Sequence, residues 1–181
     1  KGNIYDFVES YKENCEKTAG KGLMCMFSGN HDVDRLARHL HGDELKVAFA
    51  FILSMPGAPF IYYGDEIGMR YVEGLKSVEG GYNRTGSRSP MQWDDSTNAG
   101  FSSAPASELY IAMDPDKDRP TAKKEMAAPD SLYHEVKKLI RIRQSHKALQ
   151  SRGKITFVYA EKNAYPLAYI RSSEEEKLFV V

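Results

Sequence analysis

Apolar and aromatic residues in the first third of the chain follow a helical spacing and then form two short continuous runs. Positions 4, 7, 8 and 11 are apolar with charged residues between them, which predicts a surface helix over residues 4–16. The runs at 23–27 and 58–63 have the length of buried strands, whereas 33–40 and 44–55 have helical spacing. Strand, polar loop, helix and strand in this order indicate a βαβ unit, whose two parallel strands end at the same edge of the sheet.

The rest of the chain changes character twice. Residues 65–129 show no periodic pattern, but their aromatic side chains favour a long ordered loop. A helix is predicted from residue 131 to about 149, and its basic last turn suits the helix dipole. Short strands follow at 155–160, 167–171 and 178–181, separated by polar turns as in an antiparallel sheet. We therefore predict an α/β domain over residues 1–152 and the beginning of an antiparallel β domain over 153–181.

Composition and charge remove several classes of function. The chain has 181 residues with 25 basic and 25 acidic side chains, so its formal charge is zero and no nucleic-acid partner is expected. No apolar run approaches the roughly 18–20 residues of a membrane span, so no membrane partner is expected. We expect no cofactor, and the cellular compartment stays undecided. The first residue is Lys1 rather than methionine and the chain stops inside an apolar run, which indicates a piece of a longer protein.

Polar residues follow the first predicted strand. Asn30, His31 and Asp32 come directly after the apolar run, at the edge where parallel α/β sheets present side chains to ligands. Taken alone, a His-Asp pair in a loop is more often a local hydrogen bond or a helix cap than a functional site. Two further histidines, His39 and His41, with Asp34 nearby suggest a divalent metal site, but the spacing matches neither common zinc motif, and we assign no metal.

Two further segments carry polar and aromatic residues. The second predicted strand, within residues 57–69, ends in Asp65 and Glu66, and the long loop contains Arg84, Arg88 and Trp93. Arginine offers a planar fork to carboxylates and sugar hydroxyls, and an indole ring can support a sugar face. Neither residue type indicates a site by itself, because a loop arginine is usually solvated and a single tryptophan usually packs as an anchor.

Together, the three segments resemble the C-terminal part of the catalytic barrel of the α-amylase family of glycoside hydrolases. Residues 27–32, FSGNHD, are similar to the family motif after barrel strand seven, and residues 57–69 to strand eight and its turn. Residues 84–101 are similar to the long loop of the α-glucosidase and oligo-1,6-glucosidase branch. The resemblance implies that residues 1–152 are the last part of a (β/α)8 TIM barrel, which family members follow with a small antiparallel β domain.

The resemblance also implies roles for individual residues. Asp32 would be the third acidic residue of the family site, a catalytic group that grips hydroxyls of the sugar at the cleaved bond and stabilises the oxocarbenium-like transition state. His31 and Arg88 would bind the same sugar, with Arg88 paired to an acidic group outside this chain, and Arg84 is a weaker candidate. The implied function is retaining hydrolysis of α-glucosidic bonds in α-glucans or maltooligosaccharides.

The same resemblance indicates what the chain lacks. A retaining glycosidase needs a nucleophile and an acid, two carboxyl groups about 5–5.5 Å apart. In the family these residues follow barrel strands four and five, which would precede Lys1, so we expect the isolated chain to be inactive. Its unpaired strand edges predict self-association. Asp65 and Glu66 are expected to hold the end of the second strand rather than to touch substrate.

Three alternatives stay open. The same motifs occur in relatives that transfer or isomerise glucosyl groups, such as trehalose synthases. They also occur in members without catalysis, which predicts a carbohydrate-binding module on the same scaffold. The third alternative is a metal-dependent hydrolase that uses His31, Asp32, Asp34 and His39.

Overall fold

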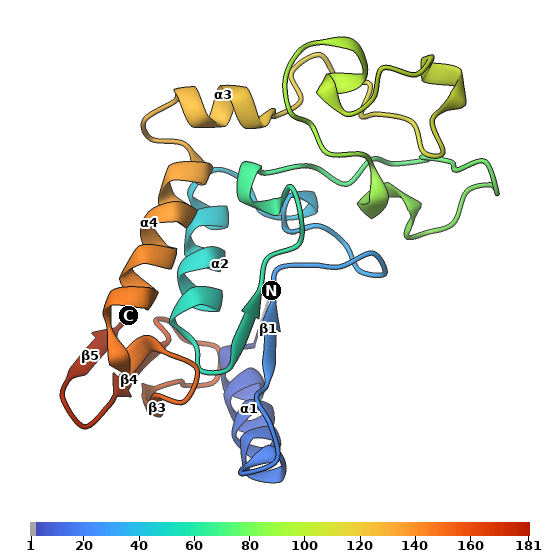
Figure 1. The fold of residues 1–181 in the computed structure, drawn as a ribbon. Helices are drawn as coiled ribbons and strands as arrows, with labels where there is room; N and C mark the ends of the chain where they lie inside the picture. The colour runs from blue at the N-terminus through green and yellow to red at the C-terminus, as the bar shows by residue number, and fades with distance from the viewer. Residues whose placement is uncertain (1–2) are drawn as a thin grey trace. The chain divides into compact units, whose positions relative to one another are not determined.

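The computed structural model describes residues 3–181, which cluster into two compact units. One unit contains the residues up to Met26, Phe51–Pro59 and Ile140–Val181, and the other contains Phe27–Ala50 and Phe60–Leu139. The helices and strands, in chain order, are α1 (Ile4–Thr18), β1 (Cys25–Phe27), α2 (Asp43–Ser54), β2 (Ala58–Phe60), α3 (Ala122–Ala127), α4 (Leu132–Ser145), β3 (Lys154–Tyr159), β4 (Ala168–Ser172) and β5 (Lys177–Val180) (Figure 1). No helix within these described residues is long and apolar enough to cross a membrane.

Strands β1 and β2 form a parallel pair, as the βαβ pattern predicts. The Ala58 amide donates to the Met24 carbonyl at 2.8 Å and the Ser28 amide donates to the Phe60 carbonyl at 2.9 Å, so both strands advance in the same direction. Gly57 enters β2 with a φ of 98°, and a Cβ at this position would lie 2.2 Å from the Met24 carbonyl oxygen. Only glycine permits this approach. The residues that follow the two strands therefore emerge at one edge of the sheet.

Strands β3, β4 and β5 form an antiparallel sheet in that order, which confirms the predicted pairing. The core of this unit is built around Tyr11 of α1, Met55 and Tyr169 of β4, which are nearly fully buried. Phe157 of β3 packs edge-on against both tyrosine rings, with 6.0 Å between ring centroids in each pair. The core therefore joins a helix from the start of the chain to a sheet at its end.

Two buried arginines complete this unit by binding main-chain carbonyls. Arg143 of α4 donates to the carbonyls of Leu53 and Met55 at 2.7 Å and to that of Gly57 at 2.9 Å. Arg171 of β4 is fully buried and donates to the carbonyls of Ser54, Gln150, Lys154 and Gly153. Burial lowers the pKa of Arg171 to about 10. Together the two side chains donate to the carbonyls of Leu53 and Ser54, the last two residues of α2, and to those of Met55 and Gly57, which follow it.

The predicted helix at residues 33–40 is wrong. Only a 3-10 turn, Leu36–Arg38, forms there. The side-chain oxygen of Asn30 accepts the amides of Asp32 and Val33 at 2.7 and 3.1 Å, which fixes a non-helical turn. Arg35 then has extended backbone angles, φ −68° and ψ 147°, so a helix cannot pass through it.

One further helix and one helix boundary also differ from the expectation. The segment from 65 to 129 is mostly irregular, as predicted, and in Figure 1 its green and yellow course is drawn largely as loops. It nevertheless contains the short helix α3, which is capped by the Thr121 hydroxyl accepting the Lys124 amide. The helix expected to reach residue 149 ends at Ser145 and is followed by a 3-10 turn, Lys147–Leu149.

Candidate active site

The polar loop after β1 places the carboxylate of Asp32 among three basic side chains. Oδ1 of Asp32 lies 3.2 Å from Nη1 of Arg84 and 3.0 Å from Nη2 of Arg88. Oδ2 lies 3.3 Å from Nε2 of His31. The Asp32 side chain is 46% exposed, so the carboxylate is held by the arginines and still open to a ligand.

The structure brings the three residues implied by the resemblance together. His31, Asp32 and Arg88 lie in one cluster, although Arg88 is 56 positions beyond Asp32 in the chain. Arg88 also donates through Nε to the His31 carbonyl at 2.8 Å. Within residues 3–181, therefore, the acidic partner of Arg88 is Asp32 itself. Arg84, the weaker candidate, contacts the same carboxylate oxygen as Arg88.

A buried network fixes both ends of the loop that carries Asp32. The Asp65 carboxylate accepts the Ser28 hydroxyl at 2.7 Å and Nη1 of Arg35 at 2.8 Å. Ser28 also accepts the Tyr62 amide at 2.9 Å, and Arg35 donates to the Tyr63 carbonyl at 2.8 Å. Burial raises the pKa of Asp65 against the opposing effects of these two partners. Ser28 and Arg35 flank the loop, so Asp65 sets where Asp32 is presented.

The long loop holds the middle of the same segment. The Ser87 hydroxyl, which is fully buried, donates to the Val33 carbonyl at 2.7 Å. Tyr63 donates to the Ser89 carbonyl at 2.8 Å, which ties the long loop to the residues after β2. These contacts lie on both sides of Arg88 and fix its position against Asp32.

Two residues of this arrangement were not singled out from the sequence. Arg35 lies three residues after Asp32, and Ser87 lies directly before Arg88. Both side chains are buried and make polar contacts, Arg35 with Asp65 and Ser87 with the Val33 carbonyl, and neither belongs to an apolar sequence pattern. A charged residue in a polar loop normally indicates a solvated position. The one available signal was the concentration of polar residues around each strand end.

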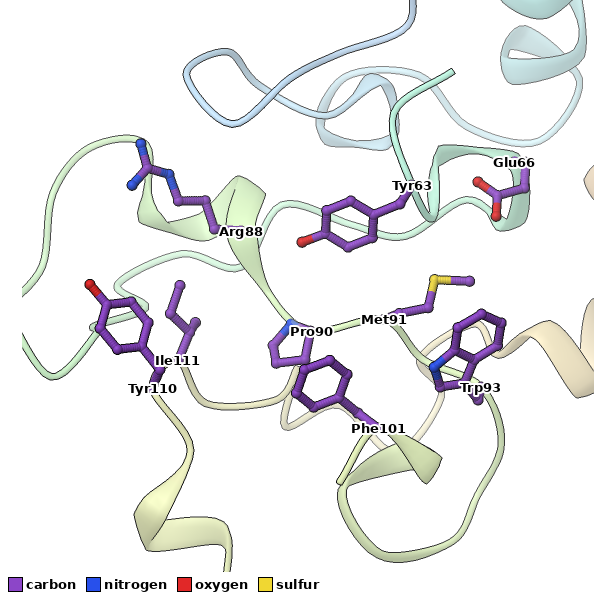
Figure 2. Close-up of a pocket in the computed structure, with 9 residues that line it drawn as sticks. All are labelled: Tyr63, Glu66, Arg88, Pro90, Met91, Trp93, Phe101, Tyr110 and Ile111. Carbon is purple, nitrogen blue, oxygen red and sulfur yellow. The ribbon is translucent and has the colours of Figure 1, made fainter. Parts of the chain in front are cut away.

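Asp65 and Glu66, at the end of the second strand, were both expected to hold the strand end, and they differ in their surroundings. Asp65 is buried and serves the loop, whereas Glu66 borders a cavity in the same unit (Figure 2). Burial raises the pKa of Glu66 and outweighs the hydrogen bonds from the Glu66 and Gly64 amides. Nowhere in residues 3–181 do three or more histidine, cysteine, aspartate or glutamate side chains gather in a way that could hold a metal ion.

The chemistry available to the cluster is that of a fixed, ionisable carboxylate with hydrogen-bond donors around it. Such a group accepts hydroxyl hydrogen bonds from a ligand and stabilises positive charge that develops beside it. Arg88 and His31 add donors in the same place, which suits a ligand with many hydroxyl groups. Arg84 and Arg88 restrain Asp32 before any ligand arrives, so little ordering is needed on binding.

Comparisons with known proteins agree with one another. The family model described as "Alpha amylase, catalytic domain" matches residues 2–152. An oligo-1,6-glucosidase from Parageobacillus thermoglucosidasius is 30% identical over 99% of this chain and 37% of its own length. A trehalose synthase from Thermus thermophilus is 33% identical over 81% of this chain and 15% of its own length.

Solved structures give the same result for the fold. A mutant of MutB, a trehalulose synthase, in complex with the substrate sucrose superposes with a TM-score of 0.82 at 25% identity. The match covers 99% of this chain and 38% of MutB. The chain thus spans less than two fifths of the length of each of these relatives, and its fold fits the corresponding part of the α-amylase catalytic domain.

Proposed function

Because the chain belongs to the α-amylase family of glycoside hydrolases, we propose that the whole protein is a retaining glycosidase that cleaves α-glucosidic bonds in α-glucans or maltooligosaccharides. The observation that carries this proposal is the cluster around Asp32. Its carboxylate follows β1 within the motif that matches the family, and it is half exposed between Arg84, Arg88 and His31. The similarity to an oligo-1,6-glucosidase favours hydrolysis as the outcome.

The same proposal assigns β1 and β2 to adjacent strands of a (β/α)8 barrel. Residues 1–152 form the C-terminal portion of that barrel, and residues 153–181 begin an antiparallel β domain. The parallel pairing of β1 with β2 and the antiparallel order of β3, β4 and β5 support this assignment. Ligands of such barrels bind at the carboxyl ends of the strands, which is where Asp32 lies.

Each residue of the cluster has a role in the proposed reaction. Asp32 binds hydroxyl groups of the sugar at the cleaved bond and stabilises the positive charge of the oxocarbenium-like transition state. The arginines contact Oδ1 and His31 contacts Oδ2, so a sugar hydroxyl would bind at the part of the carboxylate that these side chains leave open. His31 and Arg88 donate hydrogen bonds to the same sugar.

The nucleophile and the general acid belong, in this proposal, to the part of the protein outside these 181 residues. A retaining mechanism requires both carboxyl groups about 5–5.5 Å apart on either side of the bond. Asp32 is assigned to the sugar hydroxyls and the transition-state charge, and Asp65 is buried against Arg35, so neither carboxylate is the nucleophile in this proposal. The isolated chain is therefore expected to bind sugars without hydrolysing them.

A second candidate is glucosyl transfer or isomerisation. The trehalose synthase and the sucrose-bound MutB favour it, because both are similar to this chain over most of its length. Transfer and hydrolysis share the glycosyl-enzyme step and differ in whether water or a sugar hydroxyl attacks it. The cluster around Asp32 serves both outcomes equally.

Product analysis of the whole protein separates these functions. The protein is incubated with isomaltose, maltotriose, maltose and sucrose, and the products are resolved by chromatography. Release of glucose with retained configuration supports hydrolysis. A new disaccharide of the same mass supports isomerisation, and saturable binding without products supports a carbohydrate-binding module. If neither products nor binding were detected, the carbohydrate function would be refuted altogether.

A further inference from the structure

A second cavity, of about 810 Å³, lies at one end of the antiparallel sheet of β3, β4 and β5 (Figure 1). It is lined by the segment between α4 and β3, by the first residues of β3 and β5, and by the end of β4 and the turn after it. All of its lining residues belong to the unit that contains Ile140–Val181, so it shares no residue with the cluster around Asp32. Its volume lies within the range of about 300–1,000 Å³ that small-molecule sites occupy.

Positive charge dominates the wall of this basic cavity. Four basic side chains and one acidic side chain line it: Lys147, Arg152, Lys154, Lys177 and Glu174. Within the described residues, only Lys147 among the four basic ones forms an ion pair, with Glu175. The chain as a whole has 25 basic and 25 acidic side chains, so the excess of positive charge here is local. Unpaired cations gathered around a concave surface concentrate anions there.

Two of the unpaired lysines lie on one face of the sheet, on either side of a serine. Lys154 of β3 is opposite Ser172 of β4, and Ser172 is opposite Lys177 of β5. Residues directly opposite one another project from the same face, and β3 and β5 are separated by two strand spacings, roughly 10 Å. The two long side chains can therefore converge on one anion. The Ser172 hydroxyl has no hydrogen-bond partner in residues 3–181 and can donate to the same anion.

A buried side chain fixes the segment that forms the rest of the wall. Arg171 is fully buried and donates through Nη2 to the carbonyls of Gln150 and Gly153 at 2.9 and 3.3 Å. It also donates through Nε to the Lys154 carbonyl at 3.3 Å. Gly153 is required in this turn, because a Cβ there would collide with the Ala148 carbonyl oxygen. The wall is thus formed before a ligand arrives, which lowers the ordering cost of binding.

Arg171 also brings a charge without a counter-ion to this site. No aspartate or glutamate in the described part of the chain pairs with Arg171, whose guanidinium contacts main-chain carbonyls. Burial lowers its pKa to about 10, so the group stays charged at neutral pH. A buried charge is normally paired with an opposite one. Because three of its partner residues line the basic cavity, an anion bound there would supply negative charge nearby.

We propose that the basic cavity binds the phosphate group of a small phosphorylated molecule. A phosphate monoester carries a charge of about −1.5 to −2 and three acceptor oxygens at neutral pH. Arg152, Lys154 and Lys177 can neutralise this charge, and the Ser172 hydroxyl can donate to a further oxygen. The volume leaves room beside the phosphate for a part the size of a sugar. The site is independent of the proposed hydrolysis, because it uses none of the residues around Asp32.

Calorimetric titration of the whole protein with inorganic phosphate and with glucose 1-phosphate tests the proposal. We expect both anions to bind at low ionic strength. The double variant Lys154→Gln/Lys177→Gln should raise each Kd at least about tenfold, because it removes two charge-assisted hydrogen bonds. Lys21→Gln/Lys117→Gln is the matched control, since it removes the same charge from two exposed lysines that do not line the cavity. Tighter binding of glucose 1-phosphate identifies a phosphorylated sugar as the ligand, whereas equal affinities mean that the site recognises the phosphate group alone.

Thermal unfolding gives a readout that a merely structural role of the lysines would not move. At constant ionic strength, added phosphate should raise the Tm of the native protein and of the control but not that of Lys154→Gln/Lys177→Gln. Without phosphate the three proteins should melt alike, because the substituted lysines are exposed. If neither anion binds, or if the double variant and the control bind with equal affinity, the proposal is overturned, whether or not the protein hydrolyses α-glucosides.

Discussion

At the scale of single residues, the buried pair Arg35 and Asp65 determines how the catalytic candidate is held. Both side chains are completely inaccessible, and their ion pair measures 2.8 Å. The Arg35 guanidinium lies 4.8 Å and 4.9 Å from the ring centres of Tyr62 and Tyr63. Neither Nε nor Nη2 of Arg35 has a hydrogen-bond partner in residues 3–181. Such a pair adds little net stability but is costly to break on one side only.

Replacing Arg35 with methionine should therefore leave the Asp65 carboxylate buried and unpaired. We expect Arg35→Met to lower the free energy of unfolding by about 3–5 kcal/mol, measured by urea denaturation. Arg38→Met is the control, because the Arg38 side chain is 30% exposed and its ion pairs lie at the surface. Adding Asp65→Leu to Arg35→Met should recover part of the loss. If Arg35→Met and Arg38→Met lowered the free energy of unfolding equally, the result would contradict this account.

Some residues of the site could be predicted from the sequence and others could not. The motif around Asp32 and the arginines of the long loop could be identified from the chain alone, because their types and order are specific. Arg35 and Ser87 could not, because they are buried by contacts to Asp65 and to the Val33 carbonyl that are 30 and 54 positions away. Polar residues that pack through distant partners leave no periodic signal.

At the scale of elements, the sequence predicts the long, strongly patterned segments and misses those defined by turns. Helices α1, α2 and α4 and the five strands occur near their expected positions. The helix expected at 33–40 is replaced by a turn, because the Asn30 side chain captures the amides of Asp32 and Val33. Helix α3 was missed because six residues are too few to show a helical period.

Arg143 connects α4 to the end of α2 and to the start of β2. Its guanidinium donates hydrogen bonds to three main-chain carbonyls, which Arg143→Ala would leave without these donors. We expect this substitution to lower the free energy of unfolding by about 2–4 kcal/mol. Arg141→Ala, an exposed position on the same helix, should change the free energy of unfolding by less than about 0.5 kcal/mol. Denaturation of both variants in parallel tests this, and an Arg143→Ala protein as stable as Arg141→Ala would show that the contacts are weak.

Glu176 joins the turn before β5 to the segment after α4. Its carboxylate lies 2.9 Å from Nδ1 of His146 and accepts the Ala148 amide at 2.9 Å. The hydrogen bond from His146, followed by that from Ala148, lowers the pKa of Glu176 below its ordinary 4.5. The folded state thus holds this proton less tightly than the unfolded state, so the contribution is complete above pH 4.5 and is lost as the pH falls through the lowered pKa.

Melting temperatures measured between about pH 6 and pH 3 test the sign of this effect. The difference in Tm between the native protein and Glu176→Gln should be largest at the upper end of the range and shrink toward the lower end. Glu174→Gln, an exposed neighbour, should follow the native profile throughout. A gap that widens as the pH falls would contradict the assignment.

At the scale of the whole molecule, we expect the isolated chain to self-associate through the free edges of the sheet formed by β1 and β2. Within residues 3–181 each of these strands pairs only with the other, and their last residues, Phe27 and Phe60, are 48% and 60% exposed. Exposed apolar side chains beside free strand edges favour pairing between chains. Sedimentation should show oligomers that increase with concentration, and Phe60→Lys should reduce them. A monomer at all concentrations would refute the prediction.

The central claim is that Asp32 acts in the reaction of an α-amylase family enzyme. It is tested most directly by the rate of α-glucoside hydrolysis in the whole protein with Asp32→Asn beside Asp34→Asn. Asp34 is a matched carboxylate two residues away, engaged with Arg38 and His39 rather than with the Asp32 cluster. We predict that Asp32→Asn lowers kcat by about 100- to 1000-fold with an unchanged melting temperature, whereas Asp34→Asn keeps most of the rate. Equal rates for the two folded variants would contradict the account.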